Sequence, residues 1–146
     1  MAALLAVVLL GAFGLLGVRT GMQSATGQGY TLSVIYPKVA RAGLDVQWTA
    51  RVHRPGGVAD DVTLAVSTDY FRMFETQGFY PDASDSTSDG EFVYFTFSKP
   101  PPGRDFVLDF DAYIQPSSQI GKTAIVRLIM GGREITSTRI RTVLMP

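Results

Sequence analysis

Residues 44–52 read LDVQWTARV and decide the fold class, because apolar and polar side chains alternate along the whole stretch. One face would carry the apolar set, which is Leu44, Val46, Trp48, Ala50 and Val52. An alternation with a period of two is the signature of a half-buried β-strand. We therefore predict a strand here, with Trp48 as a residue of the core.

The same signal recurs along the rest of the chain after residue 29. Apolar residues alternate or cluster at strand length in residues 30–36, 62–66, 91–97, 106–114, 124–130 and 134–144. Turn signals separate these segments, namely Pro37, the RPGG run at 54–57, the KPPPG run at 99–103 and the pair Gly131-Gly132. We expect Pro37 to end the first strand. About seven short strands predict an all-β fold, an immunoglobulin- or fibronectin-like β-sandwich over residues 30–146.

Residues 1–18, MAALLAVVLLGAFGLLGV, have a different chemistry. They carry no charged side chain, and all the Asp, Glu, Lys and Arg of the chain lie from Arg19 onward. Eighteen helical residues rise about 27 Å, close to the roughly 30 Å of a bilayer core. We predict a single transmembrane helix over 1–18, a small and polar linker over 19–29, and an extracytoplasmic domain over 30–146. The cell membrane is therefore the expected location, and the lipid bilayer an expected partner.

Two alternatives to this membrane model stay open. The head could be a secretory signal cleaved after Gly27, although no Lys or Arg precedes the apolar run as signal peptides require. The second alternative concerns the orientation. Arg19 alone would favour placing the C-terminal flank of the span in the cytoplasm, but the β-domain has the character of an extracytoplasmic module, so we expect it outside the cytoplasm.

Three glycines of the head, Gly11, Gly14 and Gly17, recur at every third position. They would leave bare backbone along one side of a helix, where another transmembrane helix can approach closely. We predict that they contact integral membrane protein subunits. The alternative is that glycine is simply frequent in membrane helices.

The composition argues against several functions. There are 13 basic and 13 acidic residues, so the formal net charge is zero and no nucleic-acid partner is expected. The chain has no cysteine and a single histidine, His53, which we expect in an exposed turn. We predict no catalytic residues, no cofactor and no metal site. The acidic run from Asp82 to Glu91 does not have EF-hand spacing, so a solvated loop is expected, with a calcium site as the alternative.

The most distinctive stretch is DYFRMFETQGFY at residues 69–80. Interfaces are enriched in such aromatic side chains together with Met and Arg. We predict a partner-binding role for Tyr70, Phe71, Phe74, Phe79 and Tyr80. The alternative is that these rings close one end of the sandwich and belong to the core.

The segments YPKVARAGLDVQWT, DYFRMFETQGFYPDASDSTSDGE, FSKPPPG and FDAYIQP, behind a single apolar span, resemble a family of small actinobacterial membrane proteins. In architecture the chain is similar to accessory subunits of the actinobacterial cytochrome bc–cytochrome oxidase supercomplex. This resemblance implies a periplasmic domain without catalytic residues, attached to a redox core.

These observations predict a non-catalytic, membrane-anchored accessory or interaction subunit of a larger membrane complex, with the respiratory supercomplex as its host. The alternative is an independent membrane-tethered binding or sensor module. A hydrolase or metal-dependent enzyme is disfavoured by the residue inventory.

Overall fold

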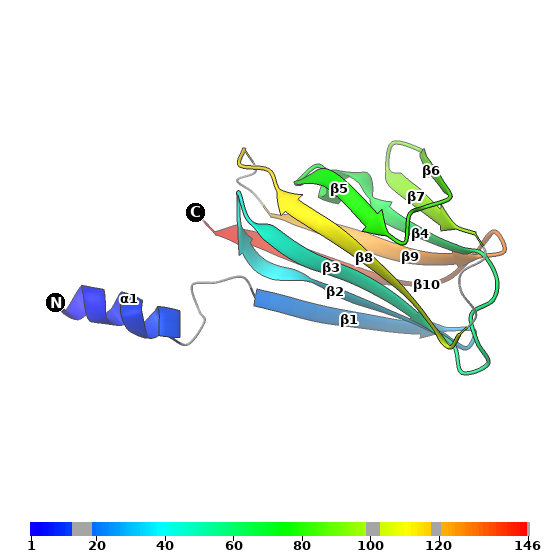
Figure 1. Ribbon diagram of the computed structural model, residues 1–146, viewed down its shortest axis with the longest axis horizontal. Helices are drawn as coiled ribbons and strands as arrows, with labels where there is room; N and C mark the ends of the chain where they lie inside the picture. Colours follow the sequence, from blue (N-terminus) through cyan, green and yellow to red (C-terminus); the bar gives the residue numbers. More distant parts are fainter. Residues whose placement is uncertain (13–18, 99–102, 118–120, 146) are drawn as a thin grey trace.

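The computed structural model describes all residues except 13–18, 99–102, 118–120 and 146. A helix, α1 (Ala2–Ala12), precedes a body made of strands (Figure 1). The body also holds one helical turn, α2 (Thr68–Phe71). The strands are β1 (Arg19–Gly27), β2 (Tyr30–Arg41), β3 (Asp45–His53), β4 (Val62–Ser67), β5 (Phe74–Tyr80), β6 (Asp85–Ser88), β7 (Phe92–Phe97), β8 (Asp105–Ile114), β9 (Lys122–Met130) and β10 (Arg133–Met145). The prediction of an all-β body is confirmed.

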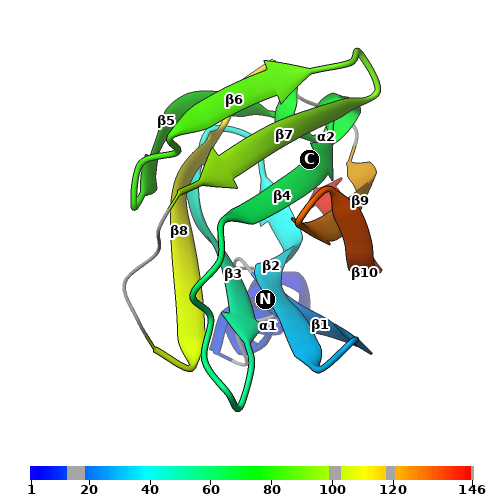
Figure 2. The ribbon, with the colours of Figure 1, turned by 90° about the vertical axis from the view of Figure 1, so that its right-hand side faces the viewer.

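The strands form one continuous sheet that curls on itself into a sandwich. Along the hydrogen-bonded path their order is β5-β8-β3-β2-β10-β9-β4-β7-β6, and β1 pairs with β2 beside this path. β10 joins the two layers, because it pairs antiparallel with β9 and then, over its last residues, parallel with β2. The result differs from the predicted arrangement of about seven strands in separate immunoglobulin-like sheets. The path instead ends in two edge strands, β5 and β6, which do not pair with each other but lie on the same side of the sandwich (Figure 2).

The structure corrects two boundaries. The predicted linker over 19–29 is mostly strand β1, which pairs with β2 from Arg19 to Gly27. Its side chains, including that of Met22, are largely exposed, so backbone pairing rather than apolar burial holds it, and no alternation marks it. Pro37 does not end β2, which continues to Arg41. The pairing of β2 with β3 stops at Ile35, so the missing N–H of Pro37 breaks no bond on that side.

The alternating strands bury the faces that their patterns indicate. Trp48 is 1% exposed and meets Phe110 of β8 edge to face, with 6.5 Å between ring centroids. On β8, the even-numbered residues from Phe106 to Ile114 are buried. Leu44 is an exception, since it lies in the turn before β3 and is 41% exposed.

The structure describes only part of the helix expected over 1–18. The described helix ends at Ala12, and the rest of the predicted span lies outside the described residues. None of the helices described is both long and apolar enough to cross a bilayer. The side chains of residues 2–9 in α1 are exposed, including Leu5 at 61% and Val8 at 58%, and every residue of the helix is apolar.

Candidate functional site: an aromatic pocket in the seam of the sheet

We call the gap between the edge strands β5 and β6 the seam, and it is closed by side chains instead of backbone hydrogen bonds. Phe79 of β5 contacts Phe95 of β7 across it, with ring centroids 4.5 Å apart. Phe79 also stacks on Phe110 of β8 at 4.8 Å and 26°. Phe71 of α2 packs against Phe95 and Phe110, at 5.5 Å from each ring. Aromatic rings from four elements therefore take the place of the missing strand pairing.

These rings do not fill the seam completely. They leave a half-open pocket of about 270 Å³ lined by Phe71, Phe79, Ser86, Val93, Phe95 and Phe110. All of these except Ser86 are apolar, and Phe71, Phe79, Val93 and Phe95 are only partly buried. A concave, mostly apolar pocket with aromatic walls is the usual form of a site that receives an apolar group.

The predicted aromatic residues divide into two groups. Phe71 and Phe79 line the pocket, and Tyr80 beside it is 80% exposed. Tyr70 and Phe74 are core residues, at 1% and 4% exposed, so the alternative reading is correct for them. Neither of these two side chains is open to a partner in this structure.

Tyr70 is also held by a buried polar chain. Its hydroxyl lies 2.8 Å from the Thr142 hydroxyl, which donates to the Pro37 carbonyl at 2.6 Å. Burial raises the pKa of the Tyr70 phenol well above its ordinary value, because the charged form would lose its solvation. The chain links α2, β10 and β2 and fixes the helical turn that presents Phe71.

Four pocket residues, Ser86, Val93, Phe95 and Phe110, were not among the predicted site residues. The signal for Val93 and Phe95 was present, because residues 91–97 are aromatic on both faces, which is unusual for a strand that faces water on one side. Phe110 looked like an ordinary inward residue of β8. Its place at the pocket depends on the curl that brings β7 over β8.

The strands around the seam carry charge of one sign. β5, β6, β7 and β8 contain no Lys or Arg, whereas Glu75, Asp85, Asp109 and Asp111 are exposed on them. Because the surrounding strands are acidic, the aromatic pocket would favour a ligand that offers an apolar side chain flanked by basic residues. The edges themselves resist strand addition, because β5 has an irregular register between Thr76 and Phe79 and β6 is only four residues long.

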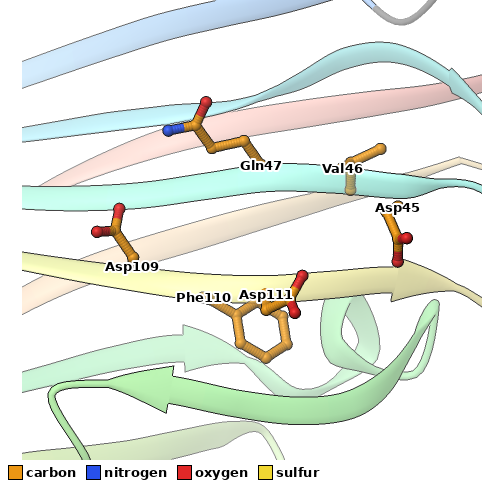
Figure 3. A pocket seen from close by; sticks show the side chains of 6 residues that line it. All are labelled: Asp45, Val46, Gln47, Asp109, Phe110 and Asp111. Atoms are coloured by element: carbon orange, nitrogen blue, oxygen red, sulfur yellow. The ribbon is translucent and has the colours of Figure 1, made fainter.

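A second hollow lies on the outer surface of β3 and β8 (Figure 3). It is broad and shallow, and its lining is Asp45, Val46, Gln47, Asp109, Phe110 and Asp111. Asp109 accepts a hydrogen bond from the Thr49 hydroxyl at 2.7 Å, so one of its carboxylate oxygens already has a partner within the protein. No group of three His, Asp or Glu that could hold a metal ion occurs in the part of the chain that the structure describes. This surface carries carboxylate side chains near the seam, but the hollow is too open to enclose a ligand.

His53 lies at the end of β3, not in the turn that follows, and its ring Nδ1 is 2.6 Å from Asp105 Oδ1 of the neighbouring strand β8. Both side chains are between two fifths and half exposed. Within the described residues, Asp105 is the one side-chain hydrogen-bond partner of His53. A histidine that acts as a general base needs a nucleophile or a water-binding group placed against its other nitrogen.

The acidic run from Asp82 to Glu91 is exposed as predicted, apart from the half-buried Ala83, but it forms edge strand β6 and a tight turn instead of a loop throughout. Asp89 organises the turn: its Oδ1 accepts the N–H groups of Phe92 at 2.7 Å and Glu91 at 3.0 Å. Its Oδ2 accepts the Tyr94 hydroxyl at 2.8 Å. The backbone N–H of Phe92 and then the Tyr94 hydroxyl lower the pKa of Asp89 below its ordinary 3.8, because both stabilise the carboxylate.

These contacts predict a pH-dependent turn. Because the folded pKa of Asp89 is depressed, its contribution to stability is present above pH 3.8 and is lost as the pH falls through the folded value. We expect Asp89→Asn to lower the thermal unfolding midpoint at pH 6. The difference from wild type should shrink as the pH is lowered below 3.8 and through the folded pKa of Asp89. A difference that stays the same throughout the acid titration would show that the turn does not depend on the carboxylate.

The three Gly residues predicted to pack in the membrane are not brought together with this site. Gly11 lies in α1, while Gly14 and Gly17 lie outside the described residues. Their predicted contact with other membrane helices stays a prediction.

No family model and no curated protein sequence matches the chain. Solved structures do match. The chain aligns over 85% of its length, and over 99% of the other chain, with the cohesin in the Coh-OlpA–Doc918 complex of Clostridium thermocellum, at 8% identity and a TM-score of 0.51. The fold resembles the cohesin β-sandwich. A second cohesin, the sixth of scaffoldin B from Acetivibrio cellulolyticus in complex with the Cel5 dockerin, aligns over 88% of this chain and 99% of its own at 16% identity and a TM-score of 0.43. At these identities the cohesin-like sandwich is a likeness of fold alone.

Proposed function

We propose that this chain is a non-catalytic protein-binding module, held at a membrane by its apolar N-terminus, that captures an apolar side chain of its partner in the seam pocket. The observation that carries the proposal is the half-open aromatic pocket between β5 and β6. Its walls are rigid, because each ring packs on at least two others across the two layers. A rigid aromatic pocket accepts an anchor side chain at little entropic cost.

The chemistry of the partner follows from the charges on the strands that form the seam and on β8. Glu75 of β5 and Asp85 of β6 are exposed on the strands that form the seam, and Asp109 and Asp111 are exposed on β8. Basic residues on either side of the inserted side chain would be drawn to this surface and would raise the association rate. The partner motif we propose is a Leu, Met or aromatic residue between Lys or Arg.

The non-catalytic part of the proposal rests on the residue inventory. The chain has no cysteine, and its single histidine is held by Asp105 on an open sheet surface. The cohesin-like sandwich is compatible with a binding role, since cohesins in the matched structures are bound to dockerins. The likeness itself supports only the fold, so the role is argued from the pocket.

The membrane part of the proposal rests on α1. A helix that is apolar on every side is either buried in protein or in lipid, and the exposed Leu5 and Val8 show that the sandwich does not cover it. We propose insertion of residues 1–18 in the cell membrane with the sandwich outside the cytoplasm. The partner would be an integral membrane protein, with the cytochrome bc–oxidase supercomplex as the predicted host. An independent tethered module remains the alternative function.

A plugging variant tests the pocket. Ser86 is exposed and lies opposite Phe95 in the β6–β7 register, so a larger side chain there would point into the pocket. We expect Ser86→Phe to weaken partner binding by roughly 30-fold or more, the loss typical of one buried anchor residue. The measurement is recovery of co-purifying subunits in mild detergent, quantified by mass spectrometry.

The matched control is Thr87→Phe, because Thr87 is the next residue of the same exposed strand and points to the other face. It should retain the partner. Equal recovery of the partner with both variants and wild type, with unchanged circular dichroism, would disprove the pocket as the binding site. A wild-type chain that purifies alone from membranes would favour the independent module.

A further inference from the structure

A second distinctive surface lies on the strand farthest from the seam. β10 is the middle strand of the path whose two ends form the seam, and it lies across the sandwich from β5 and β6 (Figure 2). Its outer face, together with the neighbouring ends of β1 and β2, carries arginines and exposed apolar side chains. We call this the basic–apolar patch, and it consists of Arg19, Arg41, Arg139, Arg141, Val143 and Met145.

The strand registers bring the patch together. On β10, Arg141, Val143 and Met145 are exposed and alternate with the buried Thr142 and Leu144, so the exposed set shares one face. Met145 lies opposite Arg41 of β2. Arg19 of β1 and Val143 of β10 both lie opposite Val39 of β2. Because paired residues point to the same face of a sheet, these side chains form one continuous surface.

The charge on this surface is not neutralised. Among the described residues, none of its four arginines forms an ion pair, whereas Arg127 on the adjacent β9 pairs with Glu134 at 3.4 Å. Val143 is 41% exposed and Met145 is 37% exposed. Arginines without an ion pair, next to exposed aliphatic side chains, are complementary to a surface that has anionic groups above an apolar layer.

The patch also lies at the end of the molecule to which α1 is tethered. Seven residue steps separate Ala12 from Arg19, so the start of β1 stays within about 25 Å of the end of α1. α1, the start of β1 and the end of β10 lie at the same end of the structure (Figure 1). If α1 enters a bilayer, the patch lies at the end of the sandwich that is next to its headgroups.

We propose that the basic–apolar patch lies flat against the anionic headgroups of the bilayer that α1 enters. This inference rests on the membrane anchor of the proposed function and adds the orientation of the sandwich to it. Each Arg near an anionic membrane surface favours binding by about 1 kcal/mol, or about fivefold. The acidic seam lies on the other side, so the same field turns the pocket away from the lipid and toward a partner.

The test places a fluorophore in the patch of the full-length chain. The chain has no native cysteine, so Val143→Cys gives one labelling site. The labelled protein is inserted in nanodiscs that contain a headgroup spin-labelled lipid, with either phosphatidylglycerol or phosphatidylcholine as the bulk lipid. We expect at least about fivefold stronger quenching in the anionic discs. Salt at 1 M, where the Debye length is about 3 Å, should abolish the difference.

Three variants on this background identify the cause. Arg141→Glu should reduce the quenching to the level in zwitterionic discs, and Arg141→Lys should preserve it because the charge is kept. Arg51→Glu changes the net charge equally at an exposed position near the opposite end of β3, and should have no effect.

Two outcomes would overturn the proposal while leaving the anchor in place. Equal quenching in both lipids is one. A dimer in detergent that requires Arg141, without quenching in either disc, is the other, since the patch would then bind the acidic side of a second copy. A chain that does not co-elute with nanodiscs at all would instead refute the membrane anchor of the proposed function.

Discussion

Replacing Leu5 and Val8 together with arginine is expected to release the chain from membranes. The two residues are three positions apart on α1, and both are more than half exposed, so neither change disturbs the packing of the sandwich. An Arg near the centre of a membrane helix costs about 2.5–3.5 kcal/mol, and two of them would lower insertion by roughly three orders of magnitude or more. The measurement is the fraction of protein left in carbonate-washed membranes.

The control for this prediction is the pair Leu5→Ala and Val8→Ala, which shortens the same side chains but keeps the helix apolar. This variant should stay in the membrane fraction. Retention of the arginine variant would contradict the anchor. The intact mass of the wild-type protein decides the remaining alternative, because a mature N-terminus near Gln28 would identify the head as a cleaved signal.

Replacing Trp48 with alanine is expected to cost about 3–5 kcal/mol of unfolding free energy. Trp48 is 1% exposed and meets Phe110, which in turn supports the aromatic rings of the seam. Removal of the indole would leave a cavity that the two strands β3 and β8, paired along their whole length, cannot close. Urea unfolding of the full-length chain, followed by far-ultraviolet circular dichroism, measures the loss without depending on tryptophan fluorescence.

Val107→Ala is the matched control, because Val107 lies on β8 between two buried residues and is 36% exposed on the outer face. Its cost should be about 0.5 kcal/mol or less. A loss below about 1 kcal/mol for Trp48→Ala would mean that the inner face of β3 has been assigned incorrectly. Partner recovery should fall with Trp48→Ala only as far as the folded fraction falls.

Several features of the candidate site could be read from residues close together in the sequence. The crowding of aromatic residues at 69–80 marked Phe71 and Phe79, and the structure places both in the pocket. The same crowding could not separate them from Tyr70 and Phe74, which are buried. That separation depends on α2, a single turn that points Tyr70 toward Thr142 on a strand 72 residues later in the chain.

The sequence by itself determined the all-β class, the inward faces of β3 and β8, the core position of Trp48 and the uncharged apolar head. Each of these follows from alternation or composition within a few residues, because successive side chains of a strand point to opposite faces of the sheet whatever the topology. It did not determine β1, whose exposed side chains carry no pattern, or the course of β2 through Pro37. The existence of β1 and the course of β2 both depend on which strands pair with them.

Only the tertiary structure decided the two surfaces for which we propose a function. The seam exists because the sheet curls until side chains of β5 and β7 meet across unpaired edges, and the pocket takes its walls from α2, β5, β6, β7 and β8. The basic–apolar patch exists because β10 leaves β9 and pairs with β2, which brings Met145 beside Arg41, more than 100 residues earlier in the chain. Long-range strand pairing sets both surfaces, and no local period in the sequence encodes which distant strands will pair.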